Sequence, residues 1–135
     1  MLRLARERNE LRVVADQYGC PTYAPDIAFA ITKIARSLVE EPEVNHPRGL
    51  FHLCGSGETN WAAFASEIFT MSTAGRDSRT VVIPIPTADY PTPARRPANS
   101  RLDTGKLACI HQIRLPDWRT SLSICLTRLG GELSA

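Results

Sequence analysis

Three arginines lie within a proline-rich stretch, residues 90–103, and together they could bind a doubly charged anion. We call this stretch the arginine loop. A guanidinium group can offer paired N–H donors to phosphate oxygens. Prolines restrict φ to about −65°, so such a loop would lose little entropy when it binds a ligand. Surface arginines in loops of this kind are also commonly solvated, and composition alone leaves both interpretations open.

The segment from Gly55 to Asn60 is a near match to the dinucleotide-binding pattern G-x-G-x-x-G, and it lies between a predicted strand and a predicted helix. Asn60 stands where the third glycine would permit close packing of the helix. Asp77, which follows at about the expected distance, falls in a polar turn and does not end a strand. We therefore predict a tight turn followed by a helix that Thr59 caps, and no cofactor site.

No other catalytic or metal-binding pattern occurs in the sequence. The four cysteines form no C-x-x-C pair, the three histidines are far apart, and neither G-x-S-x-G nor S-x-x-K is present. Asp16, Asp26 and Asp103 are better explained as turn or helix-capping residues than as acid/base pairs. From the residues alone, the chain has the means for anion recognition and no visible catalytic machinery.

Apolar periodicity and turn residues predict the elements that position these side chains. Pro25 and Asp26 are typical of a helix start, a run of apolar residues bounded by glycines predicts a buried strand, and Gly130 is typical of a helix end. The predicted helices are 1–9, 25–40, one from about residue 60 to 69, 103–110 and 117–129, and the predicted strands are 11–14, 50–54 and 80–85.

Composition bounds the class of protein. The chain has 135 residues, enough for one domain with a real core, and 43% of them are hydrophobic. A net charge of +2 is too small to favour nucleic acid or an anionic membrane as partner. The first residues carry charges at short intervals and form no signal-peptide core, and the unpaired cysteines are typical of a reducing compartment. We therefore expect a cytoplasmic location.

Several spaced motifs occur in an order that resembles a known family. They resemble the C-terminal part of the dTDP-4-dehydrorhamnose reductases, which are extended short-chain dehydrogenase/reductases, and the likeness covers nearly the whole chain. The motifs are Asp16–Thr22, Pro25–Ala28, Gly49–Leu53, Thr59–Ala65 and Tyr90–Leu102.

The resemblance implies an α/β fold that forms the C-terminal lobe of such an enzyme, with the N-terminal Rossmann dinucleotide-binding part missing. Residues 1–14 would be a remnant of the last helix and strand of the Rossmann domain, and residues 15–135 the substrate-binding lobe. The family reduces dTDP-4-dehydro-6-deoxy-L-mannose to dTDP-L-rhamnose with NADPH, or sometimes NADH, and a tyrosine of a Y-x-x-x-K pair donates the proton. No tyrosine here has a lysine four residues later. We therefore expect this chain alone to bind no cofactor and to be inactive.

The same resemblance assigns residues to a site for the dTDP-sugar. It implies that Arg95 and Arg96 meet the pyrophosphate, although one of two adjacent arginines in an extended loop is expected to be structural. Asn99 and Arg101 would orient the loop or reach the nucleotide. Facing the cleft near the sugar would be Gln17, Pro21 and Thr22.

The predicted strand 11–14 would be an outer strand of the parent's parallel sheet. Without its neighbours it would expose an unpaired edge and an apolar face, so we expect marginal stability or a homodimer. Two other interpretations remain open. One is a non-catalytic binding or regulatory module on the same scaffold, as in the methionine adenosyltransferase regulatory subunit, and the other is a truncated product without a function of its own.

Overall fold

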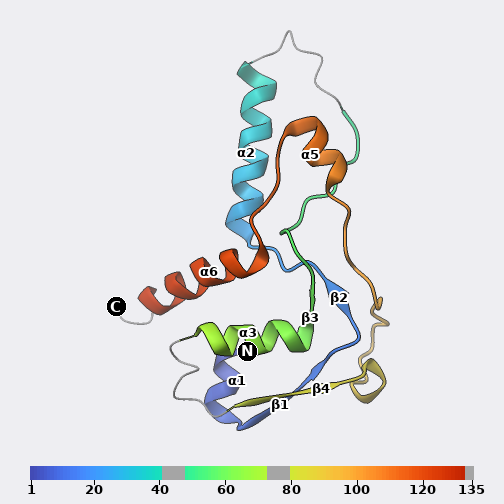
Figure 1. Cartoon of the computed structure of the whole chain (residues 1–135), viewed down its shortest axis with the longest axis vertical. Coiled ribbons are helices and arrows are strands. Elements are labelled where there is room, and N and C mark those ends of the chain that lie inside the picture. Colours follow the sequence, from blue (N-terminus) through green and yellow to red (C-terminus); the bar gives the residue numbers. More distant parts are fainter. Residues whose placement is uncertain (41–47, 73–79, 133–135) are drawn as a thin grey trace.

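A computed structural model describes residues 1–40, 48–72 and 80–132. It has the α/β architecture expected from the sequence, with helices and short strands along an elongated body (Figure 1). The elements are α1 (Leu2–Glu7), β1 (Glu10–Val14), β2 (Tyr18–Gly19), α2 (Ala24–Glu40), β3 (Thr59–Asn60), α3 (Trp61–Met71), β4 (Val81–Ile85), the 3-10 turn η1 (Thr87–Asp89), α5 (Gly105–His111) and α6 (Trp118–Glu132).

Strands β1 and β4 form a parallel pair at one end of the molecule, in register from Glu10 opposite Val81 to Val14 opposite Ile85. Both strands were predicted, and their pairing was not. β4 runs through Pro84 and lies within the predicted range 80–85, because an edge strand tolerates a residue without an N–H. Among the described residues, β1 has no strand on the edge opposite β4.

One face of this pair is covered by α3. Leu11 and Val13 point to one side of β1 and pack against Ala62 and Ala65, whose small side chains let the helix approach closely. Asn60 caps α3, because its side-chain oxygen accepts a hydrogen bond from the N–H of Ala63 at 2.8 Å. The prediction that Thr59 would be the cap is wrong.

Helices α3 and α6 lie side by side in the middle of the molecule (Figure 1). Trp118 is 2% exposed and packs with Ile68 and Leu122, and its ring meets Phe64 edge-on at 5.5 Å. α6 continues past Gly130, where the sequence predicted its end. A glycine in a helix costs only about 1 kcal/mol relative to alanine, so it does not have to end one.

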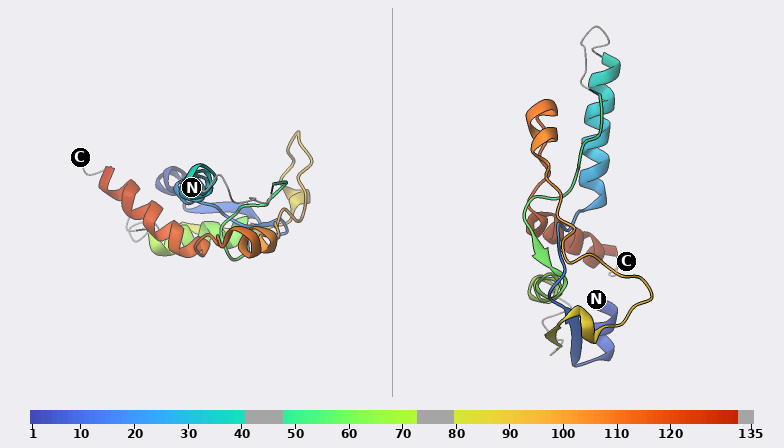
Figure 2. Two further views of the ribbon diagram at one scale, coloured as in Figure 1. Left: turned by 90° about the horizontal axis from the view of Figure 1, so that it is seen from above. Right: turned by 90° about the vertical axis from the view of Figure 1, so that its right-hand side faces the viewer.

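Helices α2 and α5 project from the end opposite the β1–β4 pair (Figure 2). Their core contains Ala30, Leu107, Ile113 and Leu115. Phe51 and Leu53 pack against this core, but residues 50–54 pair with no strand, so the prediction of a strand there is wrong. An apolar run of five residues has no period that distinguishes a strand from a buried extended segment.

Two of the three aspartates predicted as turn or capping residues lie at helix starts. Asp103 accepts a hydrogen bond from the N–H of Gly105 at 2.7 Å, which closes a turn directly before α5, whose N-cap is Thr104; it is therefore a turn residue, one of the two roles predicted for it. Asp26 lies in the first turn of α2, and its carboxylate accepts from the hydroxyl of Ser121 at 2.5 Å. This carboxylate therefore ties α2 to α6.

Candidate functional site

The loops that follow β1 and β4 meet at the carboxyl ends of these parallel strands. In open α/β sheets this edge is where ligands bind. The hydroxyl of Thr87, after β4, donates to Asp16 at 2.6 Å and accepts from the amide of Gln17 at 3.0 Å. Gln17 is only 8% exposed, so this hydrogen bond holds a buried polar side chain at the edge of the site.

Asp16 is the third aspartate predicted as a turn or cap residue, and it joins two loops. Besides the hydroxyl, its carboxylate accepts the backbone N–H of Thr87, at 2.9 and 3.0 Å from its two oxygens. The Thr87 hydroxyl, and then the Thr87 N–H, hold the pKa of Asp16 below its ordinary value of 3.8, because both donors favour the charged form.

A cavity of about 350 Å³ opens beside this junction. Its floor is apolar, formed by residues of α1 and β1, and its rim carries aromatic and polar side chains from β1, from the segment that follows β1, from α3 and from the arginine loop. Those rim residues are Arg12, Gln17, Trp61, Tyr90, Thr92 and Arg96. A second cavity of about 150 Å³ shares Gln17 and Trp61 and is completed by residues that include Pro21 and Ser100. The two cavities therefore lie next to each other, on either side of Gln17 and Trp61.

Arg95 and Arg96, the adjacent arginines, differ in their surroundings. Arg96 lines the larger cavity, and Arg95 lines neither this cavity nor the smaller one. Within the described residues, neither guanidinium has an ion-pair partner. Arg12, on the same rim, lies 3.6 Å from the carboxylate of Asp89. Arg96 is therefore the cation of this cavity that no described carboxylate neutralises.

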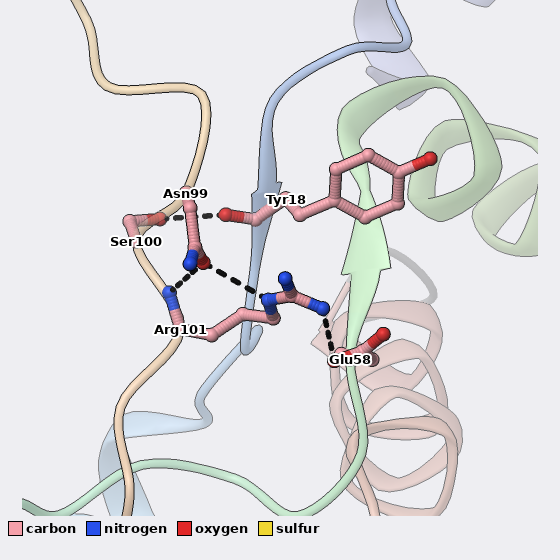
Figure 3. Close-up of polar contacts among 5 residues, drawn as sticks. All are labelled: Tyr18, Glu58, Asn99, Ser100 and Arg101. Carbon is pink, nitrogen blue, oxygen red and sulfur yellow. Dashed lines mark hydrogen bonds and ion pairs between the residues drawn. The ribbon is translucent and has the colours of Figure 1, made fainter.

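The remaining arginine of the loop, Arg101, is held by other side chains (Figure 3). Its Nε donates to the side-chain oxygen of Asn99 at 2.9 Å, and its terminal nitrogen lies 2.7 Å from a carboxylate oxygen of Glu58. Its guanidinium also lies 5.7 Å from the ring centre of Tyr18. Both acceptors and the ring belong to this chain, so Arg101 is committed to internal contacts.

The end of the arginine loop runs beside β2. The N–H of Tyr18 donates to Ala98, and both the N–H and the hydroxyl of Ser100 donate to the carbonyl of Tyr18, at 2.9 and 3.0 Å (Figure 3). The N–H of Arg101 also donates to the side chain of Asn99 at 3.1 Å, which closes a local turn. Of the residues predicted for this loop, Asn99 and Arg101 are brought together.

Pro21 and Thr22 lie against the glycine-rich turn. Thr22 donates its hydroxyl proton to the carbonyl of Cys20 at 2.9 Å and accepts from the N–H of Gly55 at 3.0 Å. A Cβ on Gly55 would lie 2.4 Å from the carbonyl oxygen of Pro21, so this position requires glycine. Thr22 therefore acts in local packing, whereas Pro21 lines the smaller cavity. The chain bends at Gly57, with φ +80°, within the predicted turn 55–60, whereas residues 59–60 form β3.

Sequence reasoning missed several residues of the site. Apolar periodicity in the predicted helix from about residue 60 to 69 places Trp61 on the core-facing side. In the structure it is 51% exposed and lines both cavities, because it begins α3 at the margin of the core. No sequence pattern identified Thr87 or Glu58 as part of the site, because their hydrogen-bond partners lie 71 and 43 residues away along the chain. Tyr90 was recognised only as part of a motif.

Neither a metal centre nor a membrane span is found in the part of the chain that the structure describes. No three histidine, cysteine or acidic side chains gather there as ligands, and no helix is long and apolar enough to cross a bilayer.

Comparison with known proteins gives one consistent family. The family model described as the RmlD substrate binding domain matches residues 1–130. A dTDP-4-dehydrorhamnose reductase of Sinorhizobium fredii is 51% identical over 121 residues, which are 90% of this chain and 40% of that protein. The chain spans about two fifths of the length of the curated relatives it matches.

Solved structures agree in fold. A dTDP-4-dehydrorhamnose reductase of Clostridium acetobutylicum superposes with a TM-score of 0.78 at 29% identity, over 96% of this chain and 42% of that one. The reductase of Bacillus anthracis, solved in complex with NADP, superposes with a TM-score of 0.75 at 30% identity, over 90% of this chain and 39% of that one. The likeness to part of each reductase is consistent with a C-terminal lobe.

Proposed function

The chain belongs to the family of RmlD substrate binding domains, and from this membership we propose that it is the nucleotide-sugar-binding part of an NADPH-dependent reductase. The complete enzyme would convert dTDP-4-dehydro-6-deoxy-L-mannose to dTDP-L-rhamnose. In this proposal residues 1–14 are the last helix and strand of the dinucleotide-binding domain, and residues 15–135 are the substrate lobe. The cofactor and the proton donor come from the remainder of the enzyme, so the 135-residue chain alone is inactive.

The observation that carries the proposal is the larger cavity, where an apolar floor and an unneutralised arginine lie together. A nucleoside diphosphate needs both, because its base is flat and apolar on its faces and its phosphates are anionic. Trp61 and Tyr90 offer aromatic surface, and Arg96 offers paired donors beside them. A volume of about 350 Å³ lies within the range of small-molecule sites.

Titration with dTDP tests this assignment, and tryptophan fluorescence reports it. Trp61 lies in the cavity and is half exposed, whereas Trp118 is buried away from it, so a bound base should change the emission of Trp61. Arg96→Ala should weaken dTDP binding by about tenfold or more, because it removes charge-assisted hydrogen bonds. Arg95→Ala should weaken it less, and the double variant should abolish it.

Arg114→Ala is the matched control, because Arg114 is exposed between α5 and α6 and lies outside both cavities of the site. Its dTDP affinity should equal that of the wild-type chain. If dTDP leaves the wild-type emission and its amide signals unchanged while the chain is folded, the nucleotide assignment is wrong. A regulatory module or a product without its own function would then be the better interpretation, and capture of a protein partner would favour the former.

A further inference from the structure

Deepening the proposed function and resting on it, we propose that Glu58 and Arg101 form a latch that holds the arginine loop in its ligand-binding position. Glu58 is then a positioning residue of the site, and Arg101 is a strut that does not touch the phosphates. Two arginines of the loop then have different roles: Arg96 binds the anion, and Arg101 holds the loop that carries Arg96 in position.

The first support is that donors of the Arg101 guanidinium already have acceptors within this chain. Nε is bonded to Asn99 at 2.9 Å, one terminal nitrogen is bonded to Glu58 at 2.7 Å, and Tyr18 lies 5.7 Å away (Figure 3). Two of its five N–H donors, on two of its three nitrogens, already have acceptors, so fewer donors of Arg101 than of Arg96 remain for a phosphate. Arg96 has no such commitment among the described residues.

The second support is how the loop is attached. Among the described residues, the stretch 91–97 makes no hydrogen bond to any other segment, although it carries Arg96. Its position is therefore set by its two ends. One end follows η1, where the N–H of Tyr90 donates to Thr87 at 3.0 Å. The other end is the contact of residues 98–101 with β2.

The latch extends that second attachment from β2 to its partner strand β3. Ser100 ties the loop to β2 alone, whereas Arg101 reaches past β2 to Glu58, which directly precedes β3 (Figure 3). β2 and β3 pair antiparallel through Tyr18 opposite Asn60 and Gly19 opposite Thr59. Arg101 therefore fastens the loop to both strands of a ribbon that also borders the smaller cavity.

The sign of one substitution separates the latch from simple electrostatics. A carboxylate near an anionic ligand repels it, so removing the charge of Glu58 should strengthen dTDP binding if Glu58 acts only through its field. If Glu58 acts by holding Arg101, the same change should weaken binding, because the loop must be ordered when the ligand arrives. Glu58→Gln keeps the shape of the side chain and tests this difference.

The expected loss is small, because both partners are partly exposed, with 41% of Arg101 and 57% of Glu58 accessible. Exposed pairs contribute modestly, so we expect Glu58→Gln to weaken dTDP binding by about two- to fivefold at about 0.01 M ionic strength, and less at about 1 M. Glu40→Gln is the matched control, because it breaks an exposed pair with Arg36 in α2, far from the loop. It should leave affinity unchanged.

The experiment is a double-mutant cycle on the full 135-residue chain, with dTDP affinity measured by calorimetry for Glu58→Gln, Arg101→Gln and the double variant. The latch predicts that Arg101→Gln loses at least as much as Glu58→Gln, because it also gives up the contacts with Asn99 and Tyr18. It predicts that the double variant loses no more than Arg101→Gln, and that exchanging the charges (Glu58→Arg with Arg101→Glu) recovers part of the loss. Unchanged or tighter binding by Glu58→Gln overturns it. A much larger loss for Arg101→Gln, additive with that of Glu58→Gln, overturns it too and assigns Arg101 to the phosphate.

Amide spectra of the ligand-free chain separate failure of the latch from failure of the nucleotide assignment. The latch predicts that Glu58→Gln shifts or broadens the signals of residues 91–97 without lowering the thermal midpoint as far as a core substitution does. If these signals do not change, the latch is wrong even where dTDP binds. If they change while the wild-type chain does not bind dTDP, the proposed function is wrong, and Glu58 is a structural tie and not a positioning residue.

Discussion

Replacing Thr87 with valine should reveal how much the junction beyond β1 and β4 contributes to stability. Val keeps nearly the same shape but has no hydroxyl, so it removes two hydrogen bonds at once. One is the bond to Asp16 at 2.6 Å, and the other is the acceptor for the amide of Gln17 at 3.0 Å. Asp16 keeps the backbone N–H of residue 87, at 2.9 Å, and water reaches it.

The magnitude follows mainly from Gln17. With 8% of that residue exposed, its amide group would remain buried without a partner, at a cost of about 1 to 3 kcal/mol in the free energy of unfolding. Asp16 is exposed, so water replaces the bond that its carboxylate loses. For a chain of 135 residues the loss corresponds to a decrease of about 4 to 12 °C in the thermal midpoint.

The assay is urea unfolding followed by the fluorescence of Trp118, which lies in the core. With a slope of about 2 kcal/mol/M, the urea midpoint of Thr87→Val should fall by about 0.5 to 1.5 M. Thr32→Val is the matched control, since the hydroxyl of Thr32 is exposed in α2 and donates only to Ala28, at 2.8 Å. Urea midpoints of the two variants that agree within about 0.25 M, which is about 0.5 kcal/mol at this slope, would refute the reasoning.

Acid adds an independent check on the same junction. The folded-state pKa of Asp16 is lower than 3.8, so its bonds to Thr87 stabilise the fold above that pH and this contribution is lost as the pH falls through the lower, folded-state value. Thr87→Val removes the larger of the causes that lower this pKa. The wild-type chain should therefore lose more stability than Thr87→Val on acidification below about pH 4, and parallel losses would contradict the assigned cause.

Three further outcomes follow from the fold. Asn60→Ala should lower the free energy of unfolding by about 1 kcal/mol, because the N–H of Ala63 loses its hydrogen-bond acceptor. Urea titration measures this change, and an unchanged free energy would mean that the cap does not stabilise the fold. Burial raises the pKa of the Cys54 thiol to about 11 from 9.0, so the free energy of unfolding should fall as pH rises between these values, and mass spectrometry should find iodoacetamide on exposed Cys109 before Cys54. The edge of β1 that pairs with no described strand should make the thermal midpoint depend on protein concentration through dimer formation, and a concentration-independent transition of a monomer would exclude this.

Helices were the part of the fold most open to prediction. Their apolar residues recur at spacings of three and four, a local signal, and α2, α3 and α6 lie within a few residues of their predicted bounds. Strand pairing was not predictable, because β1 and β4 are about 70 residues apart and no local pattern records which strands meet. Residues 50–54 show the same limit. Their apolar composition predicted burial, which holds for Cys54, but it could not show that no neighbouring strand pairs with them.

The three arginines of the loop show why a candidate site is only half visible in a sequence. All three have the same chemistry and lie within seven residues, so composition treats them alike. What separates them is the acceptor that folding brings to each, and Glu58 lies 43 residues away from Arg101. The carboxylate that occupies Arg101 therefore leaves Arg96 as the loop arginine that lines the cavity without a described ion-pair partner. Spacing predicted an anion-binding loop, and only the long-range contact assigns its members to binding or to support.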